Sequence, residues 1–504
     1  MTTRPTITLA VEPARERVPR SSFRQAILLG VLGTLISAWG SWIPSLWGDE
    51  AASVMSAQRP LSSLFLMLLH VDAVHGTYYL FLHFWVEAFG ASPFSVRLPP
   101  AIAVGFAVAG VVYLVSRLGT VRLAMFAGLI CCILPRVTYM GEETRTFAFG
   151  AAYAVWATWV LVCLVADGPK SRRWWIAYGI LMTFGTYAFL YFGVFFAVHG
   201  LILLSSRHSR PIIRRWLVSS AVSIGAAAPL LVVGYLQRSQ IAYLADETTV
   251  TFSAMTVGLW FGTPTFAIVA WALIIVGLGA AVVKRALWPH TSGLSLIVVA
   301  TLWMVVPGVI LVIVSIPQNS FTSRYLSYSA PAAAILMSMG IETIARGGLR
   351  RMVGLTAIIA AFAVPIYLSQ RTLYAKNGSD WAEVSSTVGA HAHVGDAIVF
   401  DDGTRQYRRP RLALHTYPAG FVGLRDVTLK TPYQESSVWF DGTYSVAAAE
   451  RLGRFRNVHR VWVVEFVLSG TPDSYGIADL ESMGFKKTNS YRTHSSLIIE
   501  MVDG

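Results

Sequence analysis

The sequence predicts a polytopic α-helical membrane protein with a small α/β domain at its C-terminal end. The 504 residues are 55% hydrophobic and only 13% charged, and the mean hydropathy is +0.56, which is too apolar for a soluble globular chain of this size. Long apolar runs alternate with short basic clusters up to residue 368. The net charge of +13 is divided among these clusters instead of forming one stripe, so it indicates membrane topology and no nucleic-acid partner.

The N-terminal end sets the orientation of the chain. Residues 1–24 are polar and basic, and the apolar run Gln25 to Trp42 is about long enough to cross a bilayer. A signal peptide is the alternative, but further apolar runs follow and no cleavage site precedes a soluble domain. The basic flank therefore predicts a cytoplasmic tail and an exit on the outer face at about residue 43.

The apolar run 77–89 decides which side the later segments reach. If it spans, four basic clusters between the following spans fall outside, against the positive-inside bias. If it lies in the interface, all four fall inside. Its helix would rise only about 20 Å, whereas the hydrocarbon core needs about 30 Å. We therefore expect an interfacial helix within a first outer loop, 43–97.

Ten further spans are expected, which makes about eleven with the first. They lie at 98–116, 123–138, 147–165, 174–188, 189–204, 216–235, 264–283, 294–316, 325–345 and 352–368. The division of 174–204 rests only on Gly185 and Gly193, which mark a turn. An odd number of spans places 369–504 outside, where the runs DAIVF, VWVVEFVL and SLIIEM predict the strands of a small α/β domain.

Under this topology most acidic residues of the membrane part lie at the outer side. They are Asp49, Glu50, Asp72, Glu87, Glu142, Glu143, Asp246 and Glu247. Ionisable groups at a membrane are costly unless they are paired or face water, so a one-sided group marks a candidate site. The alternative is a solvated face with ordinary loop charges, and we prefer it for Glu87, Asp246 and Glu247.

Asp49 and Glu50 form the first candidate group. They stand in LWGDEAAS, after the aromatic border residues Trp42 and Trp47, and an amphipathic apolar stretch follows them. Hydrophobic flanks hold these carboxylates near the interface, where a raised pKa or tight pairing with a cation is expected.

The segment YMGEETRTFAF, 139–149, forms the second group between two spans. Glu142, Glu143 and Arg145 either neutralise one another as a loop cap or face Asp49 across an outer cavity. In the second case the carboxylates suit sugar hydroxyls or a cation, and the arginine suits phosphate.

Two smaller groups complete the outer border. Asp72 and His75 precede the interfacial helix and either mark its beginning, since Asp is a good cap, or join the acidic groups. Arg324 and Tyr325, in FTSRYLSYSAPA, stand at the outer mouth of a span. They are either an interfacial anchor or a clamp for the phosphate of a lipid.

Taken in order, these segments resemble the GT-C superfamily of integral-membrane glycosyltransferases, and within it the actinobacterial relatives of protein mannosyltransferases and aminoarabinose transferases. The resemblance covers roughly residues 25–370, in WGDEAAS, HGTYYLFLHFWVEAFG with FSVRLPPAIA, YMGEETRTFAF and SRYLSYSAPA. It implies a GT-C fold for the transmembrane domain, 25–368, with a catalytic first outer loop. Residues 369–504 would then form an extracytoplasmic domain.

Such enzymes move a sugar from a polyprenyl-phosphate carrier to an acceptor at the outer face of the cytoplasmic membrane. The resemblance implies that Asp49 activates the acceptor hydroxyl and that Glu50 orients the substrate. A one-step displacement would invert the anomeric configuration, with a carboxylate taking the proton and cations holding the phosphate. The substrate-binding residues expected are Asp72, His75, Tyr139, Glu142, Glu143, Arg145, Arg324 and Tyr325.

Several features stay open at this point. Mannose is the favoured sugar and arabinofuranose the second, and the acceptor is a glycan, a glycolipid or a protein. The second outer loop reads EET where many relatives have EAR or a single Asp, so the resemblance does not choose between Glu142 and Glu143. A divalent cation, Mg²⁺ or Mn²⁺, held by Asp49 and Glu142 is a further option.

Two other functions are compatible with a membrane chain of this kind. A transporter or flippase for a lipid-linked sugar would carry ionisable residues at mid-membrane depth and broken helices in paired halves, and the sequence shows neither. The second alternative is a structural protein that binds envelope polymer through its outer domain. In such a protein the carboxylates at the membrane border would have no function.

Overall fold

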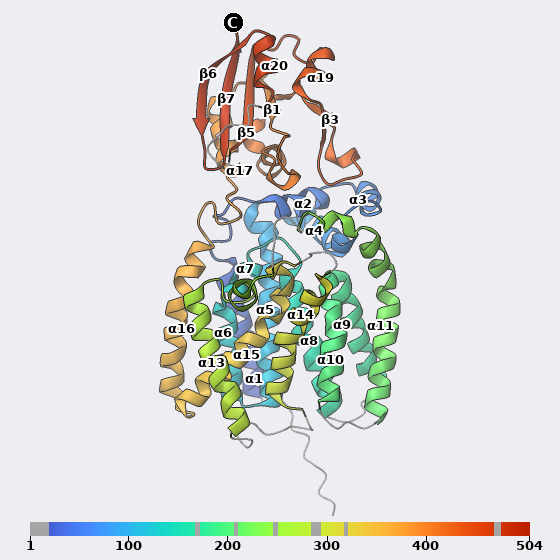
Figure 1. Ribbon diagram of the computed structural model, residues 1–504, viewed down its shortest axis with the longest axis vertical. Helices are drawn as coiled ribbons and strands as arrows, with labels where there is room; N and C mark the ends of the chain where they lie inside the picture. Colours follow the sequence, from blue (N-terminus) through green and yellow to red (C-terminus); the bar gives the residue numbers. More distant parts are fainter. Residues whose placement is uncertain are drawn as a thin grey trace, which may run out of the picture.

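A helical bundle with an α/β domain at one end makes up the computed structural model (Figure 1), which describes residues 20–166, 172–205, 210–244, 250–283, 294–316, 321–467 and 475–504. The bundle helices are α1 Arg20–Ala38, α5 Pro93–Leu118, α6 Val121–Ile133, α7 Pro135–Gly141, α8 Phe147–Ala166, α9 Arg172–Ala188, α10 Phe195–Leu204, α11 Arg210–Leu236, α13 Pro264–Val283, α14 Leu296–Val314, α15 Ala330–Ala345 and α16 Leu349–Ser369. Most of the predicted basic tail, together with Asp246 and Glu247, lies outside the described residues.

The chain is a multi-pass membrane protein. Among the described residues, six helices are long and apolar enough to cross a bilayer: α5, α8, α11, α13, α14 and α16. The bent pair α6 and α7 makes a seventh if it counts as one span. The other predicted spans overlap the remaining bundle helices α1, α9, α10 and α15. The total of eleven crossings and their orientation therefore stay predictions.

Three of the predicted spans differ from the helices in detail. Helix α5 begins five residues early, because Ser92 caps it by accepting a hydrogen bond from the Ser95 amide (3.3 Å) and Pro93 fits its first turn. The predicted span 123–138 bends by 61° where Pro135 interrupts it. The expected turn within 174–204 comes at Phe189, whose backbone is extended.

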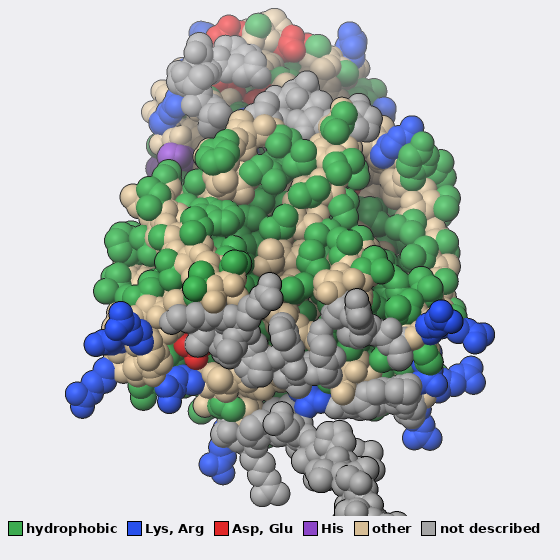
Figure 2. Space-filling view, turned by 60° about the horizontal axis from the view of Figure 1, so that its bottom comes forward, with side chains coloured by type: hydrophobic (Ala, Val, Ile, Leu, Met, Phe, Trp, Pro, Cys, Tyr) green, Lys and Arg blue, Asp and Glu red, His purple; other side chains and the backbone are tan. Residues whose placement is uncertain are grey.

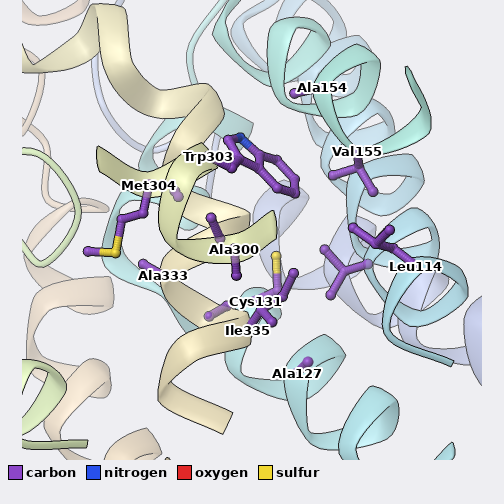
Figure 3. Close-up of a cluster of buried hydrophobic side chains, with 14 of the residues drawn as sticks. Leu114, Ala127, Cys131, Ala154, Val155, Ala300, Trp303, Met304, Ala333 and Ile335 are labelled. Atoms are coloured by element: carbon purple, nitrogen blue, oxygen red, sulfur yellow. The ribbon is translucent and has the colours of Figure 1, made fainter. Parts of the chain in front are cut away.

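The core of the bundle is built from small and large apolar side chains that interlock. Side chains of α5, α6, α8, α14 and α15 meet in one buried cluster (Figure 3). Alanines let the helices approach closely, and Trp303 fills the space that this approach leaves. The cluster includes Leu114, Ala127, Cys131, Ala154, Val155, Ala300, Trp303, Met304, Ala333 and Ile335.

The first outer loop covers one end of the bundle. It forms the short helices α2 Gly48–Ala57, α3 Leu61–Leu68 and α4 Gly76–Phe89, which lie between the bundle and the α/β domain (Figure 1). Helix α2 is almost wholly buried, since every residue from Glu50 to Ala57 is buried. Its first turn is therefore held between the two parts of the chain.

The C-terminal domain contains a mixed five-stranded sheet in the order β2-β1-β5-β7-β6. Strand β1 is parallel to β2 and β5, and β7 is antiparallel to β5 and β6. A two-stranded sheet, β3-β4, lies beside it. The strands are β1 Ala397–Phe400, β2 Arg425–Asp426, β3 Leu429–Thr431, β4 Gly442–Thr443, β5 Arg460–Phe466, β6 Phe485–Arg492 and β7 Ser496–Asp503, and the helices are α17 Trp381–His391, α18 Leu412–Thr416, α19 Val446–Arg451 and α20 Ile477–Ser482.

The α/β domain and the first outer loop share a hydrophobic core. Ala51 and Met55 of α2 pack with Trp381, Phe400 and Trp462 of the C-terminal domain in one buried cluster. Basic side chains gather along the rim of the opposite end of the bundle (Figure 2). The two ends of the bundle are therefore chemically different.

Candidate active site

Asp49 and Arg324 form an ion pair at the end of the bundle that faces the α/β domain. Asp49 stands in the first turn of α2, and Arg324 lies in the 3₁₀ segment Ser323–Ser329 that precedes α15. Arg324 Nη1 lies 2.7 Å from Asp49 Oδ2 and 3.3 Å from Glu143 Oε1. The side chains of Asp49 and Arg324 are 21% and 22% exposed, whereas that of Glu143 is fully buried.

Arg145 holds the other side of Asp49. Its Nη1 donates to the backbone oxygen of Asp49 (3.2 Å) and to Ser53 Oγ (3.2 Å), and its Nη2 lies 3.0 Å from His75 Nε2. Tyr79 lies 3.5 Å from the same guanidinium and donates from its hydroxyl to Asp72 Oδ2 (3.1 Å). The structure therefore joins the Asp72 and His75 group to Asp49 through Arg145.

The charges around Asp49 set its protonation. Burial by itself would raise the pKa of Asp49, but Arg324 and Arg145 outweigh it and hold the pKa below the usual 3.8. Burial, with the neighbouring Arg145, lowers the pKa of His75 well below 6.5. Asp49 is therefore ionised at neutral pH, and neutral His75 accepts the Arg145 hydrogen bond at Nε2.

Glu50 does not face the same space as Asp49. Its side chain is fully buried, and its Oε1 accepts from Arg97 Nε (2.7 Å) and from the Thr144 amide (3.0 Å), while Oε2 pairs with Arg97 Nη2. Arg97 also donates to the carbonyl oxygens of Ser41 (2.6 Å) and Pro44 (2.8 Å). Through these contacts Glu50 fixes α2 against α5 and the second outer loop, and the substrate-orienting role expected of it stays a prediction.

Glu142 is likewise turned away from Asp49, toward the linker between the bundle and the α/β domain, residues 370–380. Arg371 Nη1 lies 3.3 Å from Glu142 Oε2, and Lys376 Nζ lies 3.3 Å from Oε1. The ammonium of Lys376 also stands over the ring of Tyr139, 3.8 Å from its centroid. Glu143 contacts Arg324, so Glu143 is the second-loop carboxylate beside Asp49.

The buried carboxylates of the second outer loop differ from Asp49 in their pKa. Burial raises the pKa of Glu142 although Lys376 and Arg371 oppose it. Burial also raises the pKa of Glu143, with Asp49 adding to the rise and Arg324 opposing it. Asp49 is therefore the member of the group best suited to remain an ionised base.

Aromatic rings surround the Asp49–Arg324 pair. The guanidinium of Arg324 stands over Trp47, 4.8 Å from the ring centroid. Tyr325 stacks on Tyr191 with 4.4 Å between centroids. Tyr243, from the segment after α11, lies 6.0 Å from Tyr407 of the C-terminal domain. The flat apolar faces of these rings suit a sugar ring, and the cationic groups beside them suit a lipid phosphate.

Sequence reasoning missed several cations of this site: Arg97, Arg136, Arg371 and Lys376. Arg136 donates from Nε to the Leu259 carbonyl (2.9 Å) and from Nη2 to Ser323 Oγ (3.2 Å), which places it beside the Arg324 segment. Arg97 and Arg136 stand in apolar runs, a signal that could have marked both. Arg371 and Lys376 carry no such signal, because only the fold brings the linker to Glu142.

A metal ion does not fit the two carboxylates named for it. Asp49 is paired with Arg324, and Glu142 is paired with Arg371 and Lys376. In the part of the chain that the structure describes, no group of three or more His, Cys, Asp or Glu residues could hold a metal ion. The carboxylates are balanced by cations of the chain itself.

Comparisons with known proteins agree on the fold. Residues 77–236 match the family described as dolichyl-phosphate-mannose-protein mannosyltransferase. The structure resembles ArnT from Cupriavidus metallidurans in the apo state (TM-score 0.57, 12% identity, 95% of this chain and 98% of ArnT). The same protein bound to undecaprenyl phosphate matches with a TM-score of 0.56, at 11% identity, over 96% of this chain and 98% of ArnT.

A third structural match is the arabinofuranosyltransferase AftD from Mycobacteria (TM-score 0.54, 14% identity), of which this chain spans 40% while 96% of its own length is covered. A search of curated protein sequences found no match. The chain therefore shares its fold with ArnT over almost the whole of both chains, and about a third of it matches the mannosyltransferase family model.

Proposed function

We propose that this protein transfers a sugar from a polyprenyl-phosphate carrier to an acceptor hydroxyl at the outer face of the cytoplasmic membrane. The observation that carries the proposal is the partly exposed Asp49–Arg324 pair beside the fully buried Glu143. An ionised carboxylate and a guanidinium at the edge of a membrane bundle supply the two functions that sugar transfer from a phosphate needs. These are a proton acceptor and a cation for the leaving group.

In the proposed step the acceptor oxygen attacks the anomeric carbon while the bond from that carbon to the phosphate oxygen breaks. The acceptor proton passes to Asp49, and the electron pair of the broken bond leaves with the phosphate. Attack and departure on opposite faces of the sugar ring would invert the anomeric configuration. A proton acceptor must lie within hydrogen-bond reach of the attacking hydroxyl, and the exposed edge of Asp49 permits this.

In this proposal, binding of the donor phosphate to Arg324 weakens the ion pair between Arg324 and Asp49. The guanidinium has five N–H donors, and Nη1 contacts both Asp49 and Glu143. A phosphate at Arg324 would compete with these carboxylates and free an oxygen of Asp49 for the acceptor. Arg145 would add a second cation on the other side of Asp49.

The comparisons support the choice of donor class. ArnT was solved with undecaprenyl phosphate, and the matching family is described by dolichyl phosphate mannose. We favour mannose as the sugar and place arabinofuranose second, the latter because AftD is an arabinofuranosyltransferase. A glycan, a glycolipid or a protein is the proposed acceptor.

Transfer of labelled sugar from polyprenyl phosphate by membranes that carry the protein tests the proposal. Asp49→Asn keeps the shape of the side chain and removes the base, so we expect transfer to fall by about 10²- to 10⁴-fold. Glu87→Gln is the matched control, because Glu87 is an exposed carboxylate of the same outer loop. Equal transfer by Asp49→Asn and wild type would overturn the role of Asp49.

A further inference from the structure

A groove runs between α9 and α11, near the end of the bundle opposite the α/β domain. Its volume is about 1080 Å³, just above the range for small-molecule sites in proteins, about 300–1,000 Å³. The walls are mainly apolar side chains of both helices, Trp175, Ile176, Ile180, Phe184, Val218 and Val222. The groove is separate from the Asp49 site, which lies at the other end of the bundle.

Hydrogen bonds between the two helices fix the floor of the groove. The hydroxyl of Ser223 donates to the Gly179 carbonyl (3.0 Å), and that of Ser219 donates to the Trp175 carbonyl (3.4 Å). A Cβ at Gly179 would meet Ser223 Oγ at 3.4 Å, an ordinary contact. Helix packing therefore does not require glycine at 179, and the missing side chain leaves room in the groove.

Arginines lie at one end of these apolar walls. Arg172, Arg210 and Arg214 line the groove and are exposed, and none of the three makes an ion pair with a residue that the structure describes. No acidic side chain is among the described residues of the lining. Figure 2 shows basic side chains along the rim of this end of the molecule. The groove thus pairs a cationic mouth with an apolar interior.

We propose that this groove binds an anionic phospholipid of the bilayer, with its phosphate on the arginines and an acyl chain along the apolar walls. Guanidinium groups match phosphate in charge and in geometry, and basic pockets between membrane helices recognise anionic head groups. The proposed sugar carrier would be needed at Asp49, at the far end of the bundle. The occupant is therefore a lipid that is not consumed in the transfer.

Native mass spectrometry of the detergent-purified protein, with phosphatidylglycerol or phosphatidylcholine added, tests the proposal. We expect the wild type to retain phosphatidylglycerol in preference to phosphatidylcholine. The double substitution Arg210→Gln/Arg214→Gln should weaken phosphatidylglycerol binding by about 30-fold, the factor for two charges at about 1 kcal/mol each. Arg350→Gln/Arg351→Gln is the matched control, since these exposed arginines begin α16 and lie outside the groove.

Gly179→Leu tests the contribution of the apolar groove without changing the arginines. The new side chain should enter the groove, so retention of both lipids should fall while the arginines remain. Three results would overturn the proposal: equal retention of the two lipids by the wild type, equal loss in the two arginine pairs, or displacement of phosphatidylglycerol by an equimolar polyprenyl phosphate. All three can be read without measuring sugar transfer.

Discussion

Glu50 and Glu143 are both fully buried carboxylates, but their neighbours balance them differently. Glu50 receives a two-point contact from Arg97 and a hydrogen bond from the Thr144 amide, whereas Glu143 shares Arg324 with Asp49. Burial raises the pKa of Glu50, but Arg97 outweighs it and the pKa is lowered below 4.5. The pKa of Glu143 is raised.

Glu50→Gln should therefore destabilise the protein strongly at pH 7. It leaves Arg97 buried without its carboxylate, and breaking a buried pair in this way costs about 3–5 kcal/mol. Thermal unfolding of the detergent-purified protein measures the effect. Glu87→Gln, at the exposed surface, is the control, and the prediction fails if both variants unfold at the same temperature.

Glu143→Gln should change stability in the opposite sense and in a pH-dependent way. A carboxyl whose folded pKa is raised contributes stability that is present below the unfolded pKa and lost as pH rises through the folded pKa. Removing Glu143 should therefore leave stability unchanged below pH 4.5, the usual value, and stabilise the protein at higher pH. Unfolding temperatures of both proteins at several pH values would show this, and a gain confined to acid pH would contradict it.

The composition of this site could be predicted only in part from single residues. Asp49, Asp72, His75, Glu143, Arg145, Arg324 and Tyr325 were expected, and the fold brings these residues together around Asp49. The partner of Glu50 was not predicted, because Arg97 is 47 positions away in the sequence. The charge pattern of the sequence shows that carboxylates lie near the membrane border. Only the packing of the folded chain shows with which cation each carboxylate forms an ion pair.

At the scale of elements, the close approach of α2 to the C-terminal domain depends on Gly48. A Cβ at this position would lie 2.2 Å from the Tyr407 carbonyl oxygen. Backbone cannot yield as a flexible side chain can, so Gly48→Ala should push α2 and the segment around Tyr407 apart. The residue next to the substitution is Asp49, whose geometry would change with it.

Gly48→Ala should therefore lower sugar transfer by about 10-fold or more while every polar group of the site remains, since displacing a reacting group by about 1 Å can cost about 100-fold. Gly279→Ala in α13 is the control, because nothing lies within 4 Å of its Cβ position. The transfer assay compares the two variants. Equal activity would show that the contact between α2 and the C-terminal domain does not position Asp49.

Helices and strands were predicted better than their ends and bends. The runs DAIVF, VWVVEFVL and SLIIEM coincide with β1, β5 and β7. Their pairing could not be predicted, because β7 lies between β5 and β6 in the sheet and the order follows no local pattern. The bend at Pro135 was missed because apolar composition continues through it, although the proline itself carried the signal.

At the scale of the whole molecule, the linker connects the bundle to the α/β domain covalently and also contacts the bundle side through ion pairs with Glu142. Lys376→Met should leave Glu142 with Arg371 alone and lower the free energy of unfolding by about 3 kcal/mol. Lys487→Met on the exposed strand β6 is the matched control. Chemical denaturation of the purified protein measures both.

The double variant Lys376→Met/Glu142→Gln sharpens this prediction. If Lys376 and Glu142 attract each other, the double variant should lose less stability than the sum of the losses in Lys376→Met and Glu142→Gln, although Arg371 loses its carboxylate in both variants that lack Glu142. If the two losses simply add, Lys376 and Glu142 do not interact. A transfer assay of the same three proteins would show whether the linker also sets the geometry at Asp49.

The position of the linker also has a consequence for biosynthesis. Glu142 emerges from the ribosome more than two hundred residues before Arg371 and Lys376, the cations that balance it. Until the linker has been made and delivered to the same side of the membrane, this carboxylate has neither partner. The outer loop can reach its final arrangement only late in synthesis, so a chain that stops before residue 371 should be recognised by quality-control proteases as unfinished.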